Sequence, residues 1–407
     1  MRKALIPVAG VLWLAGSCLA TPAGYTLTPM DPNTYRNWVS RWQSSIVGDE
    51  RNRYCDSAMG EDVAWLMQPF LNGFYYGYEA THDPNWIRME ANWADSWIKR
   101  KLIEPDGYPG WPKLGAAGTD VDKLNSYYAD SMLGDAMALA PIVLTAGEIL
   151  RTPSLNAVYG AKARSYLDLS VQIYNKWVSR GGFRDTAGGG AISIVQPWGI
   201  DANTWTWTGK YVLRNDPNWG FSHPDNKANE VAMWLLAMYD ATGDANFRNQ
   251  ASKWYTLMKS RMKLEPNGVY DVWNYWQPAG NWDYDPNGHR NKHWIGVHPN
   301  NGYYQIDTTS IVAAYEHGVV FTLSDIQGLV KTDLSLLAGD GNLIWPALAP
   351  YSPEIQRRFE ASFQPDSWGG HGLAPQYLYF ENQVPEPACA AALALGAAAI
   401  LRRRRRR

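Results

Sequence analysis

Apolar residues recur along the chain with the spacing of one helix face. Between residues 62 and 78 they fall at i, i+3, i+4 and i+7, which is the pattern of an amphipathic helix. These positions are Val63, Leu66, Met67, Phe70, Leu71, Phe74 and Tyr78. Further apolar runs occupy 130–149, 229–239 and 307–320, and a more polar helical segment follows each of them. The pattern therefore predicts helical hairpins, each with a buried first helix and a half-exposed second helix.

Two of these hairpins are copies of one another. Residues 78–111 and 239–273 share Tyr, Ala-Thr, Asp, Asn, an aromatic residue, Arg, Trp, Glu-Pro, Gly, Tyr and Trp in the same order. A weaker copy starts at Thr145 and a degraded one at Thr322, while residues 34–47 supply another helix. Repeated units of this kind stack on their neighbours. We therefore predict an all-α domain over residues 25–383, whose hairpins close into an incomplete or complete (α/α) toroid; an open solenoid is the alternative.

Three long links join the hairpins at one end of the predicted ring. They cover 104–129, 183–228 and 265–306, and they do not follow the repeat. Long connections gathered on one face suggest a binding or catalytic site there. Many of the 21 tryptophans lie in these links, among them Trp205, Trp207 and Trp219. Aromatic faces suit sugar C–H groups, so we expect these three to bind a glycan, with loop-core packing as the alternative.

Both ends of the chain carry targeting patterns. Residues 1–20 have Arg2 and Lys3, then an apolar run and small residues, which predicts a secretory signal peptide. Residues 384–407 contain Pro-Glu-Pro, a short apolar segment and six arginines, and resemble a PEP-CTERM sorting signal. This resemblance implies export, removal of the tail by an exosortase-type protease, and delivery to the cell surface or extracellular matrix. Contact with a membrane would be limited to the tail, which could also remain as a short anchor.

Charge and cysteine content narrow the function classes. The net charge of −2 includes eight positive charges from Arg2, Lys3 and the terminal arginines, so the segment between is near −10. Such an acidic domain is not expected to bind nucleic acid. Cys55 is the single cysteine between the two end segments. We therefore expect no internal disulfide, and stability must come from the core.

The repeated hairpins, covering roughly 34–350, resemble the six-hairpin group of carbohydrate-active enzymes. That group includes glycoside hydrolases, uronate-processing hydrolases and polysaccharide lyases. The segment "DVAWLMQPFL" (62–71) is similar to one in unsaturated glucuronyl and rhamnogalacturonyl hydrolases, in which an Asp is catalytic. In this chain the segment lies on the first strong hairpin, and for this reason the catalytic role is not assigned to Asp62. Mannan-cleaving members carry an adjacent Asp-Asp pair, which this sequence lacks. The resemblance implies a polysaccharide substrate and a toroid fold.

A His-Pro-acid/amide-Asn segment occurs twice, at 223–226 and 298–301, each time before an apolar helix. The two copies are one repeat apart, so they should lie side by side on the ring. In toroidal lyases, Asn, His, Tyr and Arg cleave uronic-acid polymers by β-elimination. By that resemblance His223, Asn226 and Tyr303, or Tyr304 in its place, would be catalytic, and His298, Asn301 and Arg290 would bind substrate. This lyase is our leading prediction, and helix capping is the alternative reading of both segments.

Acidic residues at the starts of inner helices support a second chemistry. They are Glu61, Asp62, Asp130, Glu230 and Asp307. Two carboxyl groups about 6.5–9.5 Å apart would suit an inverting or uronate-processing glycoside hydrolase, with Glu230 as one of the pair. Acids also cap helices without any catalytic role. A non-catalytic glycan-binding or matrix protein is a third prediction.

The stretch "DYDPNG" (283–288) matches the first half of a calcium-binding loop. Asp283, Asp285 and Asn287 would be its side-chain ligands. An ordinary Asp-Pro-Asn turn is the alternative, because the same tripeptide recurs at 83–85 and 216–218. Neither of the predicted chemistries requires a cofactor.

Overall fold

The computed structural model describes residues 22–114, 127–192, 200–206, 221–284, 295–337 and 344–383. The predicted signal peptide and sorting tail lie outside these ranges. The described part is dominated by helices that pair into hairpins, as the apolar pattern predicts.

Six elements form an inner layer of the described structure. They are α2 (Asp62–Thr81), α4 (Met132–Arg151), α6 (Asp225–Thr242), α8 (Asn301–Glu316), the 3₁₀ segment η4 (Pro346–Tyr351) and α11 (Gly370–Gln383). The outer layer consists of α1 (Pro32–Glu50), α3 (Pro84–Lys99), α5 (Pro153–Ser179), α7 (Ala245–Arg261), α9 (Leu323–Leu337) and α10 (Pro353–Ser362). Each inner element thus has an outer partner.

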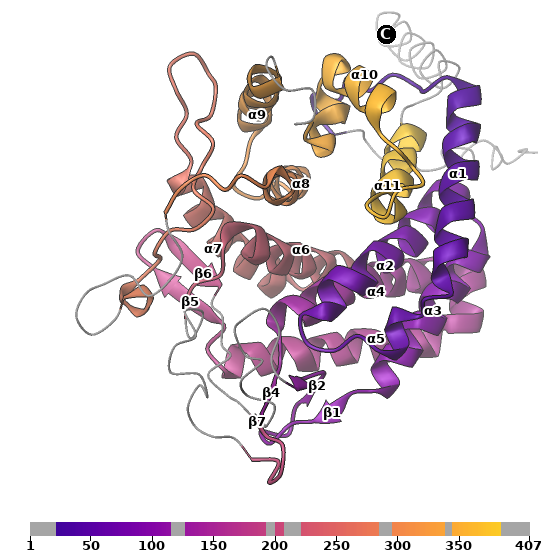
Figure 1. Ribbon diagram of the computed structural model, residues 1–407, viewed down its shortest axis with the longest axis vertical. Coiled ribbons are helices and arrows are strands. Elements are labelled where there is room, and N and C mark those ends of the chain that lie inside the picture. The colour runs from indigo at the N-terminus through magenta and orange to yellow at the C-terminus, as the bar shows by residue number, and fades with distance from the viewer. Residues whose placement is uncertain are drawn as a thin grey trace, which may run out of the picture.

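The inner elements form a closed ring (Figure 1). In chain order α2 packs on α4, α4 on α6, α6 on α8, and α8 on η4. The short η4 packs on α10, and α10 reaches α11 through Phe359 and Tyr377. Helix α11 then packs on α2 and α1, which closes the ring. The toroid prediction is confirmed, and the ring is complete.

Short antiparallel strands lie in the long links. Strand β1 (Leu102–Ile103) pairs with β2 (Pro109–Gly110), and β5 (Phe183–Thr186) pairs with β6 (Gly189–Ile192). A third sheet has the order β3 (Lys113–Leu114), β4 (Tyr127–Ala129), β7 (Ile200–Asp201). The all-α prediction did not include these strands, because the links carry no alternating pattern long enough to indicate them.

The repeated Asp-Pro-Asn motif begins outer helices. The carboxylate of Asp83 accepts the backbone N–H of Asn85 at the start of α3, and Asp31 accepts that of Asn33 at the start of α1. In α7 the variant Asp-Ala-Asn does the same, with Asp244 accepting from Asn246. An Asp side chain at this position satisfies N–H groups that have no partner within the helix. The Asp-Pro-Asn copies at 31–33 and 83–85, which the structure describes, are therefore helix N-caps.

Most of the described tryptophans fill the core. Trp42, Trp93, Trp97, Trp177, Trp234 and Trp254 are fully buried between the inner and outer helices. Trp97 stacks on Trp111 from the first link, with ring centroids 3.7 Å apart. Trp273 and Trp276 of the third link are buried as well. Packing, rather than sugar contact, thus accounts for much of the tryptophan content.

Gly73 of α2 permits the contact that closes the ring. A Cβ atom at this position would lie 2.5 Å from the carbonyl oxygen of His371, which belongs to the backbone of α11. We expect Gly73→Ala to lower the free energy of unfolding by about 1–3 kcal/mol, because α2 and α11 must move apart. Urea denaturation measures this effect. The matched control is Gly48→Ala on α1, where nothing lies within 4 Å; unchanged or increased stability is expected there. Equal effects of the two substitutions would contradict the close approach.

Candidate active site at the N-terminal face of the ring

The N-terminal ends of α2, α6 and α8 meet the long links on one face of the ring, which we call the N-terminal face. Two side-chain contacts join α2 to α6 there. Lys227 Nζ lies 2.6 Å from Glu61 Oε1, and Gln68 Nε2 donates to Glu230 Oε2 at 2.9 Å. Since α4 packs between α2 and α6 in the ring, these contacts run across its interior. Glu61 and Gln68 are seven residues apart, so they share one face of α2.

Glu230 is a buried acid of α6 that accepts a hydrogen bond from Gln68. Its side chain lies about one and a half turns into α6, and the residue is only 5 % exposed. Burial raises the pKa of Glu230 to about 7, although the hydrogen bond from Gln68 favours the charged form. Within the described ranges no Lys or Arg forms an ion pair with it. A carboxyl group with this pKa holds its proton near neutral pH.

Asn226 lies one turn before Glu230 on the same face of α6. Its residue exposure is 1 %, and neither amide atom has a hydrogen-bond partner among the residues that the structure describes. An unsatisfied buried amide costs about 1–3 kcal/mol, so native proteins rarely keep one without a use.

Two more acids flank this face of α6. Asp225 Oδ1 accepts from Arg261 Nη1 at 2.9 Å, and burial raises the pKa of Asp225 to about 6 against the effect of Arg261. Asp307 on α8 accepts hydrogen bonds from Asn229 Nδ2 (2.7 Å) and Trp273 Nε1 (2.8 Å). Burial, then the charge of Asp225, raises the pKa of Asp307 well above its usual range. Both oxygens of Asp307 are engaged, so this residue holds α6, α8 and the link together.

Three aromatic side chains stand together beside these acids. Tyr275 stacks on Tyr303 with centroids 5.2 Å apart, and the His298 ring lies 4.9 Å from Tyr275 and 4.7 Å from Tyr303. The Nδ1 atom of His298 accepts the backbone N–H of Asn300 at 3.0 Å, which places the proton of the neutral ring on Nε2. The Tyr275 carbonyl accepts the N–H of Asp225, which ties these rings to the start of α6.

The structure brings some predicted residues together and separates others. His223, Asn226 and Glu230 lie at or before the start of α6, next to the helix that carries Tyr303, with His298 in the link before it. The repeated His-Pro segments therefore do precede neighbouring inner helices. His223 is buried, and its N–H donates to the Ile192 carbonyl.

Other predicted residues lie elsewhere. Asn301 accepts from Trp345 Nε1 at 3.1 Å and so contacts the segment before η4 rather than the aromatic group. The indole N–H of Trp205 donates to the Ile103 carbonyl, and its ring lies 5.6 Å from Tyr128, in the strands of the first two links. Trp207, Trp219, Arg290, Asp285 and Asn287 lie outside the described residues.

Asp283, the first predicted calcium ligand, is fully buried and already satisfied. Its carboxylate accepts the Ser222 N–H and hydroxyl at 2.8 Å each, and the Ala279 N–H at 2.6 Å. The two bonds from Ser222 join the second and third links, and the bond from Ala279 lies within the third link. Asp283 therefore has a positioning role in the described structure, and the calcium site stays a prediction.

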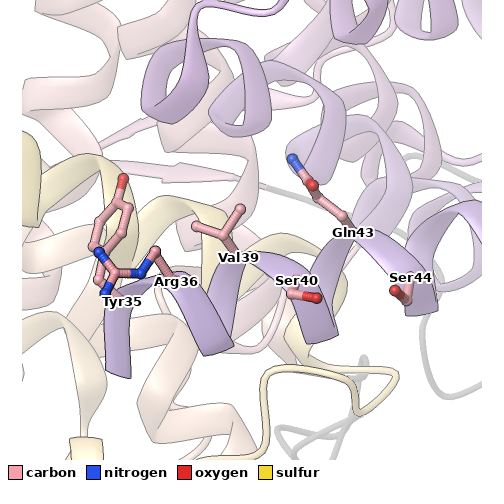
Figure 2. A pocket seen from close by; sticks show the side chains of 6 residues that line it. All are labelled: Tyr35, Arg36, Val39, Ser40, Gln43 and Ser44. Atoms are coloured by element: carbon pink, nitrogen blue, oxygen red, sulfur yellow. The ribbon is translucent and has the colours of Figure 1, made fainter. Parts of the chain in front are cut away.

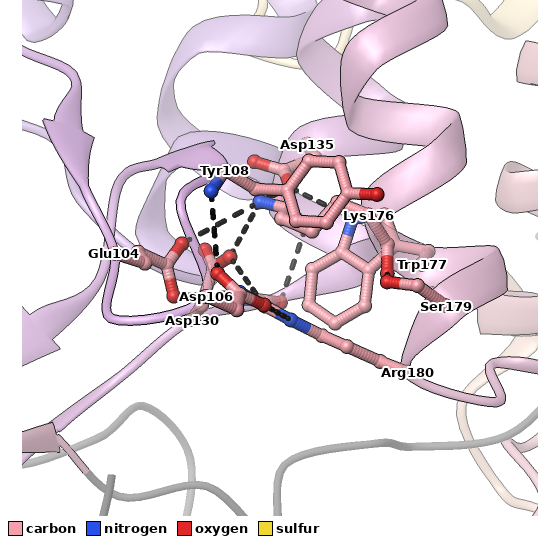
Figure 3. Close-up of polar contacts among 11 residues, drawn as sticks. Glu104, Asp106, Tyr108, Asp130, Asp135, Lys176, Trp177, Ser179 and Arg180 are labelled. Atoms are coloured by element: carbon pink, nitrogen blue, oxygen red, sulfur yellow. Dashed lines mark hydrogen bonds and ion pairs between the residues drawn. The ribbon is translucent and has the colours of Figure 1, made fainter. Parts of the chain in front are cut away.

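A buried ion network lies under the start of α4 (Figure 3). Lys176 of α5 is fully buried, with Nζ 2.6 Å from Asp130 and 2.8 Å from Asp135. Arg180 pairs with Glu104, Asp106 and Asp130. Burial, with the charge of Asp130, raises the pKa of Glu104 well above its usual range. Asp130, predicted from its helix-start position, thus belongs to a structural network.

Sequence reasoning missed Gln68, Lys227 and Tyr275. Gln68 follows Glu61 by seven residues, so the helical period could have placed both on one face. Lys227 lies between two residues that the sequence singled out, whereas Tyr275 had no comparable signal.

A surface groove lies apart from these groups. It runs along the outer helix α1 and is lined by Tyr35, Arg36, Val39, Ser40, Gln43 and Ser44 (Figure 2). No buried acid lines it. The groove is therefore separate from the buried acids of the N-terminal face.

Five carboxyl groups that are buried or half-buried make stability depend on pH. Burial raises the pKa to about 7 in Glu79, Asp135, Glu230, Asp333 and Glu381. The folded protein binds these protons more tightly than the unfolded chain, so their contribution is complete below about pH 4 and is lost as pH rises through about 7. We expect the free energy of unfolding to fall between about pH 5 and pH 8 in urea titrations. Glu79→Gln should flatten this slope; a rising slope in the unmodified protein would contradict the burial of these acids.

Comparisons with known proteins give matches in structure alone. No family model and no curated protein matches the chain. An inactive variant of the α-1,6-mannanase GH76A of Salegentibacter sp. HEL1_6, with two adjacent aspartates replaced by alanine, is 13 % identical. The match covers 85 % of this chain and 98 % of that one, with a TM-score of 0.46.

Two further solved structures are similar. The family 76 mannosidase Bt3792 from Bacteroides thetaiotaomicron VPI-5482 is 11 % identical, with 87 % and 100 % of the two chains covered and a TM-score of 0.49. A family 88 glycosyl hydrolase from Bacteroides vulgatus is 8 % identical, with 86 % and 99 % covered and a TM-score of 0.38.

Proposed function

We propose that this protein is a glycan-degrading enzyme, a glycoside hydrolase in which Glu230 donates the proton. The observation that supports this most directly is the isolated carboxyl group of Glu230, whose pKa burial raises to about 7. A protonated acid inside a largely apolar ring is the group that a departing glycosidic oxygen requires. The hydrogen bond from Gln68 fixes one carboxyl oxygen and leaves the other to carry the proton.

We assign Glu61 as the general base that activates the attacking water. It lies on α2, across the ring from α6, and the Lys227 ammonium contacts it at 2.6 Å. In the proposed reaction Glu230 gives its proton to the leaving oxygen as the glycosidic bond breaks. Glu61 takes a proton from the attacking water, whose oxygen forms the new bond to the sugar. Asp307 is less suited to this role, because Asn229 and Trp273 already engage its oxygens.

A lyase is the second candidate, supported by the group of Tyr275, His298 and Tyr303. Tyr303 would remove the proton next to a uronate carboxyl group in β-elimination. Because His298 Nδ1 accepts a backbone N–H, this histidine is suited to donate from Nε2 rather than to act as the base. A non-catalytic glycan-binding protein is the remaining alternative.

One assay separates these candidates. The purified protein is incubated with neutral and acidic polysaccharides, and both reducing ends and the ultraviolet absorbance of unsaturated uronates are followed. New ends without absorbance support the hydrolase. New ends with absorbance would instead establish the lyase, and binding without either signal would leave the binding protein.

We also propose that the protein is exported and reaches the cell surface or extracellular matrix, with its tail removed by an exosortase-type protease. Residues 1–20 and 384–407 support this by their composition. Among the described helices, α4 alone is long and apolar enough to cross a membrane, and 78 % of that apolar stretch is buried inside the protein. It is therefore a core helix of the ring.

Gln68 should set the pH at which activity declines. Its amide donates to Glu230 and favours the charged form, so Gln68→Met is expected to raise the pKa of Glu230 further. The alkaline limb of the profile of kcat/KM against pH should therefore move to higher pH. An unchanged alkaline limb would show that Glu230 is not the proton donor.

A further inference from the structure

We infer that the N-terminal face binds an uncharged glycan through its hydroxyl groups and discriminates against uronic acids. This inference rests on the proposed function, because it concerns the same site. It differs from the uronate substrate that the sequence pattern favours.

The charges of the described site are the first reason for this inference. Four acidic side chains lie there, namely Glu61, Asp225, Glu230 and Asp307, against two cations, Lys227 and Arg261. Lys227 is engaged with Glu61 at 2.6 Å, and Arg261 with Asp225 at 2.9 Å. Both cations of this group are therefore already paired with its acids. A uronate would therefore bring a further negative charge next to acids whose two neighbouring cations are already paired.

The side-chain amide of Asn226 is the second reason. Asn226 lies beside Glu230 on α6 with both its N–H₂ group and its oxygen lacking partners among the described residues. A sugar hydroxyl donates and accepts, so one or two hydroxyls can satisfy both ends of this amide. A carboxylate only accepts, and would leave the Asn226 oxygen facing a second negative oxygen. The amide is 1 % exposed, so the bound sugar must displace the side chains that now cover it.

Sites that hydrogen-bond to a hydroxyl reject analogues that cannot form the same bonds. The paired acids and the free amide therefore act together. The acids exclude negative charge, and Asn226 selects a group that offers both a donor and an acceptor.

The test uses one uronic-acid oligosaccharide and its carboxyl-reduced form, in which each carboxylate has become CH₂OH while linkage and stereochemistry are unchanged. Both are titrated calorimetrically into the full chain carrying Glu230→Gln, so that binding is measured without cleavage. We expect the reduced form to bind at least about tenfold more tightly across several such pairs. Tighter binding of the uronate, or binding of neither form in any pair, would overturn the inference.

Two further measurements keep the result unambiguous. Asn226→Asp should weaken binding of the reduced form about tenfold or more, whereas Asn85→Asp at the exposed start of α3 should leave it unchanged. Thermal unfolding of each variant shows whether it is folded, and Asn226→Ala serves if the Asp variant is not. Binding of the reduced form without cleavage by the unmodified protein would reject the hydrolase and leave this inference standing.

Discussion

Glu230→Gln is expected to lower kcat on the cleaved glycan by about 10²- to 10⁴-fold, the range usual for loss of a general acid. Gln has the size of Glu and keeps a contact with Gln68, but it has no proton to give to the leaving oxygen. The pKa of Glu230, which burial raises to about 7, makes the proton available near neutral pH. KM should change little, because the substitution removes an interaction of the transition state.

The control for this substitution is Glu316→Gln at the other end of the ring. Glu316 lies at the end of α8 and accepts hydrogen bonds from Tyr25 and Tyr351. Activity of the control should stay within about twofold of the unmodified protein if acids away from the N-terminal face have no part in the chemistry. A substrate whose leaving group needs no protonation should rescue Glu230→Gln. Absence of rescue, with the fold retained, would assign the proton to another residue.

Lys176→Met is expected to destabilise the protein by about 3–5 kcal/mol, because it leaves buried carboxylates without their cation. Lys176 is fully buried and contacts Asp130 and Asp135, which lie on the segment that starts α4. Arg180 also contacts Asp130, whereas the ion pair of Asp135 with Lys176 is lost in this variant. Urea denaturation at about pH 8 should show the full loss, because the acids then give up their protons.

Lys162→Met on the same helix is the matched control. Lys162 pairs with Asp95, and both side chains are close to half exposed. Pairs of this kind contribute about 0–1 kcal/mol, so the control should lose little stability. If the two substitutions cost the same, the network around Lys176 contributes nothing beyond a surface ion pair. Asp135→Asn combined with Lys176→Met should recover part of the loss.

The ring was predictable because its signals are local and repeated. Apolar spacing within single helices identified α2, α4, α6 and α8, whereas the Asp-Pro-Asn motif was interpreted as a turn and proved to cap outer helices. The fifth inner element was not predictable as a helix, because η4 is a 3₁₀ segment with two prolines, Pro346 and Pro350. Its place in the ring is set by α8, α9 and α10, which lie around it.

The site was predictable only in part. Sequence repetition placed His223, Asn226, Glu230, His298 and Tyr303 near neighbouring helix starts, and the structure agrees. It could not show that Gln68 and Glu61 reach α6 across the ring, since that pairing depends on closure. Nor could it show that Asp130 and Asp307 are already satisfied by partners from other elements. Helix-start acids look alike in a sequence, and burial and hydrogen-bond partners distinguish them.

The closure of the ring also decides when the protein can fold. Trp42 of α1 donates to the His371 carbonyl, 329 residues later, and the Met30 N–H bonds to Glu381, 351 residues away. Helices made first during synthesis therefore wait for nearly the whole chain before their last partners arrive, a high-contact-order arrangement that folds slowly. The two ends of the domain lie side by side once it is folded, so a circular permutant that joins them and opens a link elsewhere should reach the same ring.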